Sequence, residues 1–182
     1  MEWMLMPLKR YAEFSGRSRR QEFWMFMLLL LIIWMVAFVA IMVMGAGAMS
    51  MAGVNPDGTP RVAGMMGMFA SMGIMAVILG IVWLALLIPT LAVQIRRLHD
   101  TDRAGWWILI YWGPAILGWI LNIAGATNQS TSLVMLGGLC SLLGLVGSIT
   151  LLVFWCLPGT NGSNRFGPDP LGGAGNLSQT FQ

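Results

Sequence analysis

The sequence predicts an all-α protein, an integral membrane four-helix bundle with both termini in the cytoplasm. Of its 182 residues only 9% are charged and 57% are hydrophobic, whereas soluble domains carry about 25% charged residues. The apolar residues gather into long uncharged stretches that suit the roughly 30 Å hydrocarbon core of a bilayer. The basic residues gather on one side of those stretches, which orients them in the membrane.

The chain begins with a basic, partly polar segment. Pro7 can open a short helix, and apolar residues alternate there with Lys9, Arg10 and Glu13. This pattern predicts a short amphipathic N-terminal segment that lies on the membrane surface. Ser18 is placed to cap the helix that follows.

The first span is predicted over residues 23–44 and the second over residues 67–93. The 22 residues of the first span carry no charge and no proline, and they measure about 33 Å at about 1.5 Å per residue. A glycine-rich loop over residues 45–64 separates the two spans. Pro89 removes the helical hydrogen bond to the carbonyl of Ala85, so a kink or an early end of the second helix is expected.

The second half of the chain contains two further spans. No charge appears between Ala104 and Asn164, a stretch that is too long for one span. A polar run at residues 127–132 divides it into a third span over residues 106–124 and a fourth over residues 133–157.

The fourth span carries small side chains at helical spacing. Cys140, Gly144 and Ser148 recur every four residues, which lets helices approach closely. Neither Cys140 nor Cys156 has a Cys or His neighbour at metal-ligand spacing, so no zinc site and no disulfide framework is predicted.

Residues 1–170 are predicted to form one membrane domain. A turn-rich segment with three glycines and three prolines, predicted to be ordered, follows the fourth span. Residues 171–182 are rich in Gly, Ser, Asn and Gln, which predicts a disordered tail.

Nine of the ten basic residues fall on one side of the predicted spans, and Arg61 alone falls on the other. Because Lys and Arg are enriched in cytoplasmic loops, both termini are predicted to be cytoplasmic. The nine are Lys9, Arg10, Arg17, Arg19, Arg20, Arg96, Arg97, Arg103 and Arg165.

Three motifs lie at the ends of the predicted spans. They are Tyr11-Ala12-Glu13-Phe14-Ser15-Gly16-Arg17-Ser18-Arg19-Arg20-Gln21-Glu22-Phe23-Trp24, then Arg96-Arg97-Leu98-His99-Asp100 with Gly105-Trp106-Trp107, then Pro158-Gly159-Thr160 with Asn164-Arg165-Phe166-Gly167-Pro168-Asp169-Pro170. Together and in this order they resemble a bacterial inner-membrane family known as domain of unknown function 805. The resemblance covers nearly the whole chain except the first loop and the tail. It implies a small multi-pass protein of the bacterial inner (plasma) membrane and supplies no reaction.

The three motifs share the predicted cytoplasmic face and supply the candidate ligand-binding residues. Guanidinium groups donate two parallel hydrogen bonds to phosphate, and basic pockets between spans hold acidic lipid headgroups. An acidic lipid, a small anion or a protein partner is therefore the expected ligand. The candidates are Arg17, Arg19, Arg20, Glu22, Arg96, Arg97, His99, Asp100, Arg165 and Asp169.

The same charges could instead serve only topology and packing. In that interpretation Arg97 pairs with Asp100, and Arg165 pairs with Glu22 or Asp169, where the spans emerge from the membrane. The sequence does not separate this interpretation from ligand binding.

An enzyme is one alternative function. His99 would act as a base oriented by Asp100, or Asp100 and Asp102 would hold a magnesium ion. The sequence has one histidine with no Ser or Cys nucleophile beside it, and it has neither a phosphate-cradling loop nor a zinc-protease motif. We therefore expect a non-enzymatic protein without a cofactor or a bound metal.

A small transporter or channel subunit is the other alternative. Ionisable residues within spans mark transport pathways, and the cores of the four predicted spans contain none. Four spans make a narrow pathway unless the protein forms a homo-oligomer, which the sequence leaves open. Nucleic-acid binding has no support beyond the basic N-terminal segment. The expected partners are the lipid bilayer and an acidic lipid or small anion.

Overall fold

The computed structural model describes residues 2–53, 55 and 61–172. It contains five α-helices and one short 3₁₀-helix, and the described residues contain no β-strand. Four helical stretches are long and apolar enough to cross a membrane. The elements are α1 (Glu2–Lys9), α2 (Arg20–Ala52), α3 (Val62–Asp100), η1 (Gly105–Ile108), α4 (Leu109–Thr127) and α5 (Thr131–Cys156).

All four predicted spans coincide with long helices, but the predicted loop over residues 45–64 is mostly helical. Helix α2 continues to Ala52 and α3 begins at Val62. Glycine weakens a helix in water by about 1 kcal/mol, whereas in lipid the helix keeps every backbone group hydrogen-bonded. The Pro- and Gly-rich centre of the loop, residues 56–60, lies outside the described residues, as do residues 173–182 of the predicted tail.

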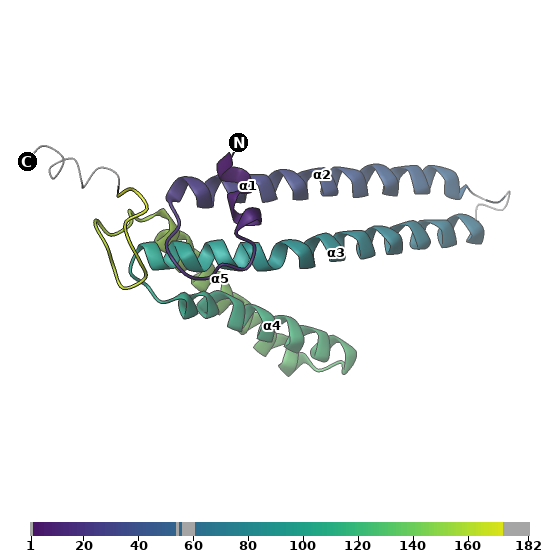
Figure 1. Cartoon of the computed structure of the whole chain (residues 1–182). Coiled ribbons are helices and arrows are strands. Elements are labelled where there is room, and N and C mark those ends of the chain that lie inside the picture. Colours follow the sequence, from purple (N-terminus) through teal and green to yellow (C-terminus); the bar gives the residue numbers. More distant parts are fainter. Residues whose placement is uncertain (1, 54, 56–60, 173–182) are drawn as a thin grey trace, which may run out of the picture.

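The four long helices form two hairpins, α2 with α3 and α4 with α5 (Figure 1). The hairpins meet where α2 begins and where α3 and α5 end, and they diverge toward their far turns. The predicted four-helix bundle is therefore a pair of hairpins joined at one end. We name this shared end the charged end. At about 1.5 Å per residue α2 and α3 measure about 50 and 58 Å, so the first hairpin tilts or extends beyond the hydrocarbon core.

Two small clusters of buried apolar side chains join the hairpins at the charged end. Phe23 and Phe26 of α2 pack with Val93 of α3. Leu98 of α3 and Leu151 of α5 pack with the last residue of η1. Trp155 contacts both clusters, and many apolar side chains on the rest of the helices are exposed, as expected for surfaces that face lipid.

Glycines form the seam between α4 and α5. Gly118 of α4 and Gly137, Gly144 and Gly147 of α5 are buried. A methyl group at Gly147 would collide with the backbone carbonyl of Ile110. Close packing on small residues of α5 is thus confirmed at Gly144, where a Cβ would lie 3.4 Å from the backbone nitrogen of Ala115.

The N-terminal segment crosses the first hairpin. Helix α1 lies across α2 and α3 in Figure 1. The Tyr11 hydroxyl donates a hydrogen bond of 2.7 Å to the carbonyl of Ala85, the group that loses its helical partner to Pro89. Helix α3 continues past Pro89 to Asp100, so the alternative of an early end is wrong. Tyr11 supplies the partner that the proline removes.

Replacing Tyr11 by phenylalanine should lower the free energy of unfolding by about 1 kcal/mol, because one intramolecular hydrogen bond is lost and the ring is kept. The measurement is thermal unfolding of the purified protein in one detergent. Tyr111→Phe is the matched control, since no hydrogen bond of the Tyr111 hydroxyl is present among the described residues. Equal losses for the two variants would contradict a role for the bond to Ala85.

Candidate functional site

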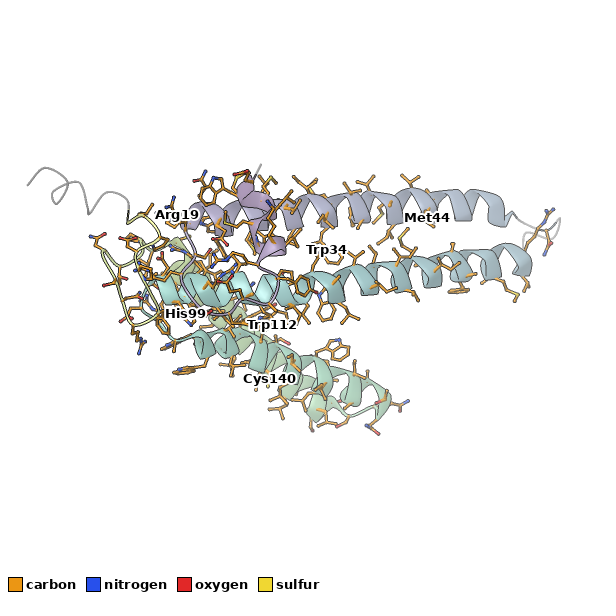
Figure 2. All side chains as sticks on the ribbon, viewed as in Figure 1. Arg19, Trp34, Met44, His99, Trp112 and Cys140 are labelled. Carbon is orange, nitrogen blue, oxygen red and sulfur yellow. The ribbon has the colours of Figure 1, made fainter. Side chains whose placement is uncertain are left out.

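The three sequence motifs converge at the charged end, although up to 151 positions separate residues that contact each other. The first motif leads into α2, the second ends α3 and precedes α4, and the third follows α5. Arg19 and His99 mark this end in Figure 2. The convergence that the sequence predicted from charge alone is confirmed as a set of contacts.

A buried carboxylate with two arginines lies at the centre of this end. Arg17 Nε donates a hydrogen bond of 2.9 Å to Asp100 Oδ1, and Arg97 Nη1 donates one to Asp100 Oδ2. All three side chains are almost completely buried. The predicted pair of Arg97 and Asp100 is confirmed, and Arg17 is a second partner that the sequence did not indicate.

Arg17 also ties the segment after α5 to the end of α3. Its two terminal nitrogens each donate a hydrogen bond of 2.6 Å, one to the carbonyl of Thr160 and one to the carbonyl of Gly162. The Thr160 N–H in turn donates 2.9 Å to the carbonyl of Asp100. A methyl group at Gly159 would overlap the Asp100 carboxylate. The glycine of this motif is therefore required by close approach.

Arg97 holds the end of α5. Its Nε donates a hydrogen bond of 3.1 Å to the carbonyl of Trp155, and its Nη2 donates one to the carbonyl of Leu157. The last carbonyls of a helix have no partner within it, so Arg97 satisfies two of them. Every guanidinium nitrogen of Arg17 and of Arg97 is engaged, which leaves neither free for a ligand.

A second ion-pair chain lies beside the first. Arg96, fully buried, donates 3.1 Å to Glu22, and its Nη1 lies 3.9 Å from Glu13. Arg10 donates 2.6 and 2.7 Å to Glu13, and this hydrogen-bonded guanidinium holds the pKa of Glu13 below its usual range. The partner of Glu22 is therefore Arg96 and not Arg165.

The sequence predicted that Ser18 caps α2, and this prediction is wrong. The residue that precedes the helix is Arg19, and its side chain makes no capping hydrogen bond within the part of the chain that the structure describes. The Ser18 N–H donates a hydrogen bond of 3.2 Å to the carbonyl of Arg96, and its buried hydroxyl has no hydrogen-bond partner among the described residues. The contact with α3 fixes Ser18 one position too early for capping.

His99 packs against two segments rather than a carboxylate. Its ring stacks on Phe166 with centroids 3.9 Å apart, and Nδ1 lies 3.2 Å from the carbonyl of Gly16. Asn164 donates 2.8 Å to the backbone carbonyl of His99. The Asp100 carboxylate contacts the two arginines described above.

Arg165 pairs with neither of its predicted partners. Its Nε lies 3.2 Å from Asp102 Oδ1, and Nη2 donates 2.7 Å to the Asp102 carbonyl. Both side chains are exposed. Asp102 adopts a positive φ of 57° in the turn that follows α3. In this turn Asp102 lies next to Arg165, so Arg165 pairs with Asp102 and not with Glu22 or Asp169.

A pocket of about 380 Å³ lies between the first turn of α2 and the segment that follows α5. Its charged lining consists of three arginines and two carboxylates. These are Arg17, Arg19, Arg20, Asp100 and Asp169.

The spare guanidinium donors of this pocket belong to Arg19 and Arg20. Arg19 uses Nε and Nη2 on the carbonyl of Pro170 and lies over the ring of Trp3, and its Nη1 makes no hydrogen bond within the described residues. Arg20 is exposed and makes no hydrogen bond or ion pair within the described part of the chain. The first N–H groups of α2 have no partner within the helix either.

Asp169 brings a negative charge to the same pocket. Its carboxylate accepts a hydrogen bond of 2.8 Å from the Leu171 N–H and one of 3.1 Å from the Gly162 N–H. These two hydrogen bonds lower the pKa of Asp169, so the group is ionised at neutral pH. The pocket thus offers guanidinium donors and a carboxylate acceptor side by side.

No metal site accompanies these charges among the described residues. No group of three or more His, Cys, Asp and Glu side chains there is arranged to hold a metal ion.

Four long apolar helices and a charged end built from three chain segments define a multi-pass membrane protein that contacts the lipid bilayer. The pattern of the family described as "Protein of unknown function (DUF805)" matches residues 11–168. The chain belongs to this family, and its resemblance in the three motifs is confirmed.

Two curated relatives come from Escherichia coli (strain K12), the inner membrane proteins YhaI and YhaH. Each is 34% identical to this chain over 170 residues, which cover 93% of the chain and 96% and 97% of the respective relative. No solved structure matches the chain. The similarity therefore covers both hairpins and the charged end.

Proposed function

We propose that this protein is a non-enzymatic membrane protein whose charged end faces the cytoplasm and binds a phosphate-bearing anion. One observation carries the proposal. Arg20 has no partner among the described residues, and it lies with the partly free Arg19 in a pocket at the uncapped first turn of α2. Guanidinium groups and free helix N–H groups are both good donors to phosphate.

The orientation is supported by charge. Nine of the ten basic residues belong to segments at the charged end, and positive charge favours the cytoplasmic side. An acidic lipid and a small soluble anion of the cytoplasm could each reach the pocket at this end.

The non-enzymatic part of the proposal is supported by the surroundings of His99. Its ring is stacked on Phe166 and faces a backbone carbonyl, and the neighbouring carboxylate of Asp100 is occupied by two arginines. A general base needs an orienting partner and access to a proton.

Transport is a second candidate because a groove between α4 and α5 gathers polar side chains within the spans. Tyr111, Asn122, Ser141 and Ser148 line this groove of about 570 Å³. Solute flux in proteoliposomes that is lost in Asn122→Leu and kept in Arg20→Gln would favour transport over the proposed binding function.

Arg19→Gln combined with Arg20→Gln should abolish anion binding and leave folding intact, because both side chains are at the surface of the pocket. The measurement is the shift in thermal unfolding of the detergent-solubilised protein with inorganic phosphate, glycerol phosphate and short-chain phosphatidylglycerol. At ten times the dissociation constant a ligand should stabilise the native protein by about 1.4 kcal/mol.

Arg165→Gln is the matched control, since it removes an exposed arginine at the same end but outside the pocket. It should keep the full shift. The proposed function fails if no phosphate compound stabilises the native protein, or if the double variant responds as strongly as the control.

A further inference from the structure

The geometry points to one ligand class for this pocket, a glycerophospholipid headgroup that carries its own hydrogen-bond donor. The phosphodiester lies against Arg19 and Arg20, and a headgroup hydroxyl or ammonium donates to Asp169. This inference rests on the proposed function and specifies its ligand.

The pocket lies at the level where lipid headgroups are found. Arg20 and Gln21 line it and come just before Phe23, the first residue of an uncharged span. Pro158 also lines it and follows Leu157, the last residue of another span. Because charged residues at span ends lie in the interfacial region, a phosphate held here is at the depth of the lipid phosphates.

One face of α2 offers the lipid chains a surface directly below Arg20. Trp24, Leu28 and Leu31 follow Arg20 by 4, 8 and 11 residues, which places them on the same helix face. These three side chains are 38%, 43% and 56% exposed. A soluble anion would make no use of this apolar strip, whereas the acyl chains of a lipid would lie along it.

The charge of the pocket matches a phosphodiester. Its lining holds three arginines and two carboxylates, so the balance is 3 − 2 = +1. A phosphodiester carries one negative charge, whereas a phosphomonoester carries about −1.5 to −2 at pH 7. The lipid class with a single negative phosphate is therefore the complementary one.

Asp169 adds a requirement for a donor in the headgroup. Each of its oxygens accepts one backbone hydrogen bond, and an ionised carboxylate has about four acceptor positions in all. A headgroup without a donor would leave this carboxylate facing the phosphate with no compensating contact. Glycerol and ethanolamine headgroups supply such a donor, and choline does not.

The test measures binding to the 182-residue chain in detergent by native mass spectrometry. The lipids are dioleoyl phosphatidylglycerol and phosphatidylethanolamine, which have a donor, phosphatidylcholine, which lacks one, and phosphatidic acid, a monoester. Glycerophosphoglycerol is the soluble headgroup without chains. We expect the two donor-bearing diesters to bind at least about fivefold more tightly than phosphatidylcholine or phosphatidic acid, and the soluble headgroup to bind more than about tenfold more weakly.

Two variants separate the contributions of the pocket residues. Arg20→Gln should weaken binding of phosphatidylglycerol by about tenfold, because a charge-assisted hydrogen bond is lost. Asp169→Asn should reduce the preference for phosphatidylglycerol over phosphatidylcholine to within about twofold. Arg165→Gln should leave both values unchanged, and thermal unfolding without lipid verifies that each variant is folded.

The outcomes distinguish this inference from the proposed function. Equal binding of the soluble headgroup and the intact lipid would overturn the lipid assignment and leave anion binding in place. Equal binding of phosphatidylglycerol and phosphatidylcholine would overturn the role of Asp169. Loss of all phosphate binding, soluble and lipid, would remove the proposed function itself.

Discussion

Replacing Asp100 by alanine should destabilise the protein by about 3–5 kcal/mol, which is the cost of leaving buried charges without a partner. Arg17 and Arg97 both lose their carboxylate, and their side chains are almost completely buried. Arg17 also loses the carboxylate that positions it, so its bonds to the carbonyls of Thr160 and Gly162 should weaken and the segment after α5 should detach from the end of α3. Thermal unfolding and the accumulated amount of protein in membranes both measure the effect.

Asp102→Ala is the control for that prediction. Asp102 lies two residues further on and pairs with Arg165, but both partners are exposed, and exposed ion pairs contribute about 0–1 kcal/mol. A small loss for Asp102→Ala beside a large one for Asp100→Ala is expected. Similar losses would mean that the charged end is held by general electrostatics and not by the buried carboxylate.

Replacing Gly147 by valine should have the second largest effect. Overpacking should lower the free energy of unfolding by about 1–3 kcal/mol. A side chain at this position meets the backbone carbonyl of Ile110, which cannot rotate away as a flexible side chain can. Helix α4 must therefore separate from α5. Unfolding in a denaturant series gives the loss in stability.

Gly138→Val tests whether position or residue type matters. Gly138 belongs to the same helix, but no described atom outside its own stretch of helix lies within 4 Å of the position that a Cβ would occupy. This variant should unfold within about 0.5 kcal/mol of the wild type. A loss equal to that of Gly147→Val would show that glycine contributes through backbone conformation rather than through the seam with α4.

The spans could be read from the sequence because lipid requires long apolar helices, and each predicted span coincides with one. The end of α2 could not be read, since residues 45–52 contain glycines that end helices in water and are tolerated in this hairpin. The divergence of the two hairpins was also missed. Apolar residues that face lipid and apolar residues that face a neighbouring helix look alike in a sequence.

The candidate site was predicted as a set of charged residues, and the structure divides that set by hydrogen bonding. Whether an arginine is free depends on carbonyls that no local pattern reveals. Arg97 is engaged by the end of α5, and Arg17 by Thr160 and Gly162. Arg20 is adjacent to similar residues and contacts none of these groups. The Pro158-Gly159-Thr160 motif was the one available signal that this segment packs closely on another.

The contacts of the N-terminal segment impose an order on biosynthesis. Arg17 leaves the ribosome early, yet the carbonyl that completes its hydrogen bonds belongs to Gly162, 145 positions later. At about 5–20 residues per second that partner follows about 7–30 s afterwards. The N-terminal segment can pack on α2 and α3 as soon as these helices are made, but the hydrogen bonds of Arg17 to Thr160 and Gly162 must form last. Closure of the charged end reports that all four helices have been inserted.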